Sequence, residues 1–144
     1  MAKNTLRLDT DGFDALIRRL ESLGGNVKKA VADALGQAAE TIAEDTKEAV
    51  AISNLPAGGK YSKGNTAKSI ITDASVNWQG DVAWVPVGFD FNAQGAGGYL
   101  ITGTPRMRPD AALHRMYRQK KYMKFVQDGI GDVLMDYIKD AMGA

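Results

Sequence analysis

The stretch that decides the fold is residues 26–52, NVKKAVADALGQAAETIAEDTKEAVAI. Its apolar residues recur at helical spacing on one face, and its charged residues occupy the opposite face. The apolar set is Val27, Val31, Leu35, Ala38, Ile42, Ala49 and Val50. Asn26 is suited to cap this segment, because its side chain can accept a backbone N–H of the first turn. We predict one helix about 39 Å long, which would cross the whole domain, since the expected radius of gyration is about 14–15 Å.

The segments on either side of this helix read differently. Residues 12–23 have one apolar stripe and predict a short helix, which Gly24 and Gly25 end. Residues 53–66 are rich in Gly, Pro, Ser and Asn, and contain Lys60 and Lys63. We predict a flexible, mildly basic loop there, longer than the usual connection.

Two runs with a period of two follow the loop. Residues 69–78 alternate apolar and polar positions, residues 82–89 read as the returning strand with Val85 and Val87 against Trp84, and Gln79, Gly80 and Asp81 between them are typical turn residues. They predict an antiparallel hairpin. Pro86 cannot donate to a ladder of hydrogen bonds, so it is expected at an edge or a bulge.

The C-terminal part returns to helical spacing. Residues 95–98 are a glycine-rich loop without a helix start, residues 99–101 predict a short third strand, and helices are expected over 110–127 and 130–142. The chain therefore predicts a single domain over residues 1–144 of the α+β class. Its elements are helices over about 12–52, a flexible loop over 53–66, a hairpin and short strand over 69–101, and C-terminal helices over 110–142.

Composition excludes several classes of site. The chain has 144 residues, a net charge of +1, no cysteine and one histidine, His114. Disulfides, thiolate metal sites and multi-histidine metal sites are therefore excluded, and no cofactor is expected. Residues 58–62 lack the spacing of a phosphate-binding loop. No apolar run reaches the ~18–20 residues of a membrane span, and nothing assembles a nucleophile, a base and an oxyanion hole, so we do not expect an enzyme.

Charge is nevertheless unevenly distributed along the chain. Residues 106–124 contain seven cations against one acid, Asp110, and the last helix repeats Asp every four residues. Such a basic segment can be a solvated helix face, a contact with an acidic neighbour, or a grip on phosphates. The aspartates can be a solvated face, a partner for that basic segment, or less plausibly a divalent cation site. The candidate contact residues are Lys60, Lys63, Arg106, Arg108, Arg115, Arg118, Lys121, Asp128, Asp132, Asp136 and Asp140.

The order of features resembles the head-to-tail joining proteins of tailed phages, called neck, tail-completion or putative tail-component proteins. Residues 23–30 (LGGNVKKA) resemble the opening of that family's long helix, and Ser69–Ile70 the start of its first strand. Residues 99–104 (YLITGT) resemble its aromatic-led strand ending in Gly-Thr, although Thr102 stands where the family has an acid. Arg108–Pro109 precedes the closing helix as in the family.

The resemblance implies a small antiparallel sheet packed on the long helix, in a virion protein assembled in the host cytoplasm. It implies a homo-oligomeric ring, a hexamer, at the neck, where DNA passes through the lumen without sequence-specific binding. Its partners would be head-closure or connector proteins and the tail terminator or tail tube, with no membrane. Two alternatives stay open: a tail terminator ring that caps the tail tube, and a nucleic-acid-binding module that uses residues 106–124.

Overall fold

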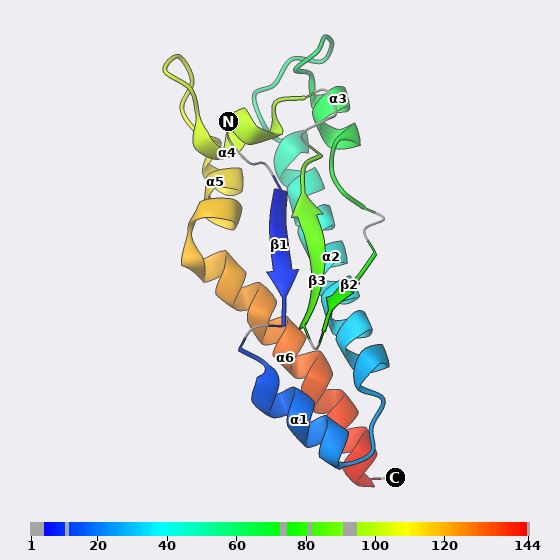
Figure 1. The fold of residues 1–144 in the computed structure, drawn as a ribbon. Coiled ribbons are helices and arrows are strands. Elements are labelled where there is room, and N and C mark those ends of the chain that lie inside the picture. The colour runs from blue at the N-terminus through cyan, green and yellow to red at the C-terminus, as the bar shows by residue number, and fades with distance from the viewer. Residues whose placement is uncertain (1–4, 11, 73–74, 81, 91–94, 144) are drawn as a thin grey trace.

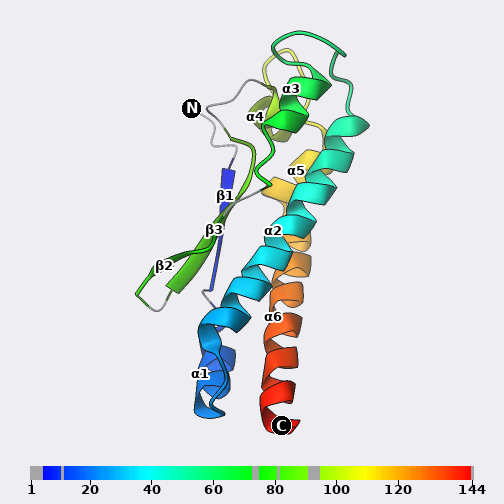
Figure 2. The same ribbon diagram turned by 90° about the vertical axis from the view of Figure 1, so that its right-hand side faces the viewer.

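The computed structural model describes residues 5–10, 12–72, 75–80, 82–90 and 95–143. The chain forms two layers: a pair of long antiparallel helices, and a small sheet against one side of that pair (Figure 1, Figure 2). The elements are β1 (Thr5–Asp9), α1 (Asp14–Ser22), α2 (Val27–Ala51), α3 (Lys63–Lys68), β2 (Asn77–Gln79), β3 (Val82–Gly88), α4 (Gly97–Thr102), α5 (Ala111–Arg118) and α6 (Lys120–Gly143). The α+β class predicted from the sequence is confirmed.

The long helix α2 forms as predicted. Its 25 residues begin after Asn26, whose Oδ1 accepts the backbone N–H of Lys29 at 3.1 Å. The buried stripe is rich in alanine, including Ala30, Ala34 and Ala38. Small side chains let backbones approach closely, and α2 packs against both α6 and β3.

The end of α1 is fixed by two glycines. Gly24 has a φ of +77°, and the N–H groups of Gly25 and Gly24 donate to the carbonyls of Leu20 and Glu21, both at 3.0 Å. This is the Schellman arrangement, in which a left-handed glycine satisfies the last carbonyls of a helix. A Cβ on Gly25 would lie 2.3 Å from Cδ1 of Leu20, so this position requires glycine as well.

The sheet has the order β1-β3-β2, with all pairs antiparallel. The predicted hairpin is present as β2 and β3, and Gly80 turns between them with a φ of +63°; Asp81 lies outside the described residues. The third strand is β1, which pairs with β3 from Thr5 opposite Gly88 to Asp9 opposite Trp84. The prediction of a third strand at residues 99–101 is wrong: those residues lie in α4, which begins at Gly97 although no helix start was expected there.

The first hairpin strand is shorter than predicted, and Pro86 accounts for this. Ala83 exchanges hydrogen bonds with Thr10 on the β1 side, and alternation along the ladder turns the nitrogen of Pro86 away from β1. On the side of β3 that faces β2, the pairing with β2 stops at Asn77, which lies opposite Trp84. Among the described residues before β2, Ile70 also pairs with this side of β3, at a bridge to Phe89. Pro86 therefore lies on the central strand and not on an edge strand, paired with β1 opposite Arg7 while its nitrogen faces the other side.

Three further boundaries differ from the prediction. The loop predicted over 53–66 ends early, because Ser62 caps α3 by accepting the N–H of Asn65 at 3.1 Å. The break between the C-terminal helices lies at Gln119, whose backbone is extended, and not at residues 128–129. Helix α6 continues through Gly129 and Gly131, because its buried residues lie on both sides of these glycines and packing outweighs their low helix propensity.

Two clusters of buried side chains hold the layers together. The first core joins α1, α2, α6 and the sheet, and the second core joins the C-terminal part of α2 to α4, α5 and the residues around Ile70 and Phe89. Tyr117 and Tyr122 pack against both cores. The first core includes Leu20, Leu35, Val85, Ile130 and Leu134, and the second includes Val50, Ile70, Phe89, Leu100 and Leu113.

Candidate interaction surface

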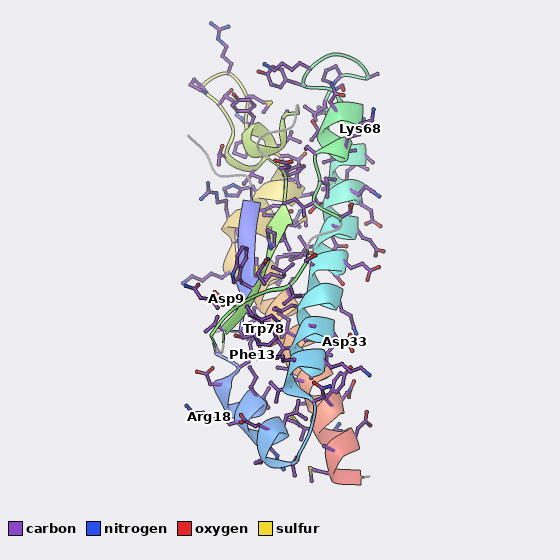
Figure 3. The ribbon with its side chains drawn as sticks, turned by 45° about the vertical axis from the view of Figure 1, so that its right-hand side comes forward. Asp9, Phe13, Arg18, Asp33, Lys68 and Trp78 are labelled. Atoms are coloured by element: carbon purple, nitrogen blue, oxygen red, sulfur yellow. The ribbon has the colours of Figure 1, made fainter. Side chains whose placement is uncertain are left out.

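The fold brings ten of the eighteen Lys and Arg residues together in one part of an elongated molecule. Residues 53–72 and 95–124 contain ten Lys and Arg against one acid, Asp110, and they run from the upper end of Figure 1 to about the middle, where α6 begins. The rings of Tyr61 and Tyr99, 5.9 Å apart and edge to face, join the two segments. In Figure 3, Lys68 lies at this end and Asp33 lies far down α2. We call this surface the basic end; it comprises Lys60, Lys63, Lys68, Arg106, Arg108, Arg115, Arg118, Lys120, Lys121 and Lys124.

The cations of the predicted basic segment lie on three elements. Arg106 and Arg108 lie on the loop between α4 and α5, Arg115 and Arg118 on α5, and Lys121 in the first turn of α6. All five are exposed, as is Lys60, whereas Lys63 at the start of α3 is half-buried. The extended residue Gln119 therefore divides the basic segment between two helices.

The aspartates lie along the solvent side of α6. Asp128, Asp132, Asp136 and Asp140 are all exposed, and we call them the acidic ridge. The buried side of the helix repeats with the same spacing at Val126, Ile130, Leu134 and Ile138. The two series are offset by two residues, or about 200° around the helix, which places them on opposite faces. Among the described residues, no hydrogen bond or ion pair joins the ridge to the basic end.

Two tyrosines of α6 fix its position beside α2. The hydroxyl of Tyr122 donates to Oδ2 of Asp45 at 2.7 Å, and that of Tyr137 donates to Asp33. Burial is the main cause that raises the pKa of Tyr122, and the hydrogen bond to Asp33 is the main cause that raises the pKa of Tyr137. Sequence reasoning missed these contacts, because it assigned both aspartates to the charged face of the long helix.

A third tyrosine links α5 to α2. The hydroxyls of Tyr117 and Thr46 are 2.6 Å apart, and Thr46 donates to the carbonyl of Ile42. Tyr117 is therefore the donor to Thr46. Burial raises the pKa of Tyr117 to about 12; the Thr46 contact lowers it and the charge of Asp45 raises it further.

His114 joins two short helices. Its Nδ1 donates to the carbonyl oxygen of Ile101 at 3.0 Å, which ties α5 to α4. Asp110 caps α5 by accepting the N–H of Leu113 at 3.1 Å. In the part of the chain that the structure describes, no three acidic or histidine side chains are grouped as a metal ion would require. None of the described helices is long and apolar enough to cross a membrane.

Comparison with known proteins adds no relative: no family model, curated protein or solved structure matches this chain. The function is therefore argued from the surfaces described above and from the resemblance in the order of sequence features.

Proposed function

We propose that this chain is a structural subunit that assembles with copies of itself into a ring at the neck of a tailed phage. The observation that carries the proposal is the separation of charge on an elongated subunit. The basic end and the acidic ridge make no ion pair with each other within the described residues, so each is free to face the other on a neighbouring copy. Contacts between two different surfaces generate closed rings when the rotation closes.

The position in the particle rests on the resemblance of the sequence to neck and tail-completion proteins. In this role the ring, a hexamer, completes the tail and joins it to the head, and DNA passes through its lumen. Its neighbours are a head-closure or connector protein on one side and a tail protein on the other. A tail terminator ring that caps the tail tube uses the same subunit contacts at a different position.

Native mass spectrometry of the purified chain, at several concentrations and at low salt, tests the assembly. We expect a closed oligomer of fixed copy number that dissociates as salt rises, because contacts between exposed charges are screened. Protein analysis of purified phage particles tests the position, and we expect the chain in tailed particles. A chain that remains monomeric and is absent from particles contradicts the proposal.

The basic end favours a second candidate function, nucleic-acid binding. It combines ten cations with two half-exposed tyrosines, Tyr61 and Tyr99, and such surfaces contact phosphates and stack on bases. The test is DNA affinity as a function of salt for the wild type and for an Arg115→Ala, Arg118→Ala, Lys121→Ala variant. Each lost phosphate contact lowers the log–log slope by about 0.9. Unchanged binding by the variant contradicts this candidate.

A further inference from the structure

A groove of about 250 Å³ lies between α2 and α6. Ala38 and Gly129 contribute small residues to it, and a Cβ on Gly129 would meet nothing within 4 Å. Phe125 also lines the groove and is 62% exposed, the largest exposed fraction among the aromatic side chains for which a value is given. An apolar hollow with an exposed ring beside it is a surface that a partner can cover.

The groove is also acidic. Asp128 and Asp132, the first two residues of the acidic ridge, line it, whereas Asp136 and Asp140 do not. A partner that carries both cations and apolar atoms on a compact surface would match this lining. A phosphate backbone would not, because the carboxylates repel it.

The loop between α4 and α5 has the complementary chemistry. Thr104 and Met107 exchange backbone hydrogen bonds of 2.8 and 3.2 Å, which leaves Pro105 and Arg106 at the tip of a tight turn. A Cβ on Gly103 would lie 2.8 Å from Cδ of Pro109, so the base of the loop is closely packed. Pro105, Arg106 and Arg108 are exposed. The loop therefore presents an apolar tip and two guanidinium groups on an ordered turn.

We propose that residues 103–109 of one copy dock into the α2–α6 groove of the next copy. Arg106 and Arg108 face Asp128 and Asp132, and Pro105 covers the apolar hollow beside Phe125. The two surfaces differ, so the contact is heterologous, and its repetition around an axis forms a ring. This inference rests on the proposed function and assigns the contact by which that assembly forms.

Charge-reversal variants test whether Asp128 and Asp132, which line the groove, matter more for assembly than the other two aspartates of the acidic ridge. We expect the Asp128→Lys, Asp132→Lys variant to raise the concentration for half-assembly roughly 30-fold or more, as for the loss of a buried charge pair. The matched control is Asp136→Lys, Asp140→Lys, which makes the same charge change on the same helix outside the groove and leaves assembly close to the wild type. Combining Asp128→Lys and Asp132→Lys with Arg106→Glu and Arg108→Glu should restore assembly. Circular dichroism checks that each variant is folded.

Introduced cysteines test the contact directly, because the chain has none of its own. Gln37 lines the groove and Pro105 lies at the loop tip, so a Gln37→Cys, Pro105→Cys variant keeps all the charges. Under mild oxidation we expect a ladder of covalent oligomers on a denaturing gel. The control pairs Pro105→Cys with Lys29→Cys, which is exposed on α2 outside the groove, and we expect no ladder from it.

The outcomes separate this inference from the proposed function. If the wild-type chain forms an oligomer but the cysteine variant gives no ladder, the docking contact is overturned and the ring remains. The same holds if reversing either aspartate pair weakens assembly equally. A wild-type chain that stays monomeric at all concentrations overturns both. An Arg106→Glu, Arg108→Glu variant that assembles normally but binds DNA less tightly overturns the contact and assigns the loop to nucleic acid.

Discussion

The two cores are built in different ways. The first core comes from long elements with regular periodicity, and Thr10 is the buried polar residue beside it. The second core is assembled from short helices and turns, and buried hydroxyl groups surround it: Thr46, Ser53, Ser62, Thr66 and Ser69. Several of these bond the backbone, such as Ser69 Oγ to the carbonyl of Thr66 at 2.7 Å. Apolar burial therefore dominates the first core, whereas the second also depends on buried hydrogen bonds.

The largest expected effects test whether the two cores unfold as one unit. Phe89 is fully buried in the second core and Leu134 nearly so in the first. We expect Phe89→Ala to cost about 3–5 kcal/mol and Leu134→Ala about 2–5 kcal/mol of unfolding free energy. Because α2 runs through both cores, and Tyr117 of α5 and Tyr122 of α6 pack against both, each variant should unfold in a single transition at lower Tm. Two separate transitions by circular dichroism would contradict this coupling.

The junction of the cores should be sensitive to alkaline pH. The pKa of Tyr117 is about 12 in the folded chain and about 10 in the unfolded chain. The folded state thus holds the phenolic proton more tightly, so this stability is complete below about pH 10 and is lost as the pH rises toward 12. The total is about 3 kcal/mol at 1.36 kcal/mol per unit.

Tyr117→Phe isolates this contribution. Denaturant unfolding between pH 9 and 12 should show a shallower loss of stability in the variant, while Tyr122 and Tyr137, whose pKa values are also raised, keep part of the slope. The same slope in both proteins would mean that Tyr117 does not contribute to the alkaline loss.

A buried hydroxyl tests the polar character of the second core. Thr66 is fully buried, and its Oγ1 accepts the N–H of Ala96 at 2.9 Å. Thr66→Val keeps the shape but leaves this N–H unpaired, which should cost about 1–3 kcal/mol. Thr66→Ser keeps the oxygen and loses one methyl group, for about 0.8 kcal/mol. Thermal denaturation should rank Ser above Val in stability, and the reverse order would show that packing, not the hydrogen bond, matters here.

The smallest expected effects compare two helix caps. Asn26 caps the long α2 in an exposed position, and Ser62 caps the short α3 in a buried one. Replacement of a cap by alanine costs about 0.5–2 kcal/mol. We expect Asn26→Ala at the low end, because water can reach the freed N–H of Lys29, and Ser62→Ala nearer the high end. Chemical denaturation measures both, and a larger loss for Asn26→Ala would contradict the comparison.

Predictions from the sequence succeeded for elements with a clear local pattern and failed for short elements in both cores. Helices α1 and α2 and the turn of the hairpin follow from apolar spacing, Asn26, the paired glycines and Gly80. Strand β1 was missed because five residues are too short for a clear pattern. Residues 99–101 do not reveal helix α4 because three apolar residues carry no period, and a Cβ on its first residue, Gly97, would lie 2.3 Å from the ring of Phe89.

The candidate surfaces show the same division. The sequence alone proposed eleven candidate contact residues, and the structure places ten of them in exposed positions and Lys63 in a half-buried one. The sequence could not reveal the groove between α2 and α6, since Ala38 and Phe125 come from helices distant in the chain. Nor could it separate Asp128 and Asp132 from the other two aspartates, because all four share one spacing.

By itself, the sequence determined the α+β class, the long helix, the hairpin turn and the existence of separate basic and acidic segments, because these depend on local periodicity, capping and charge. The tertiary structure alone decided where α5 gives way to α6, which strand completes the sheet, which tyrosines bind which aspartates and where the groove lies. These features depend on contacts between residues far apart in the chain, such as Tyr137 with Asp33. Their free energy comes from packing and desolvation, which no local pattern encodes.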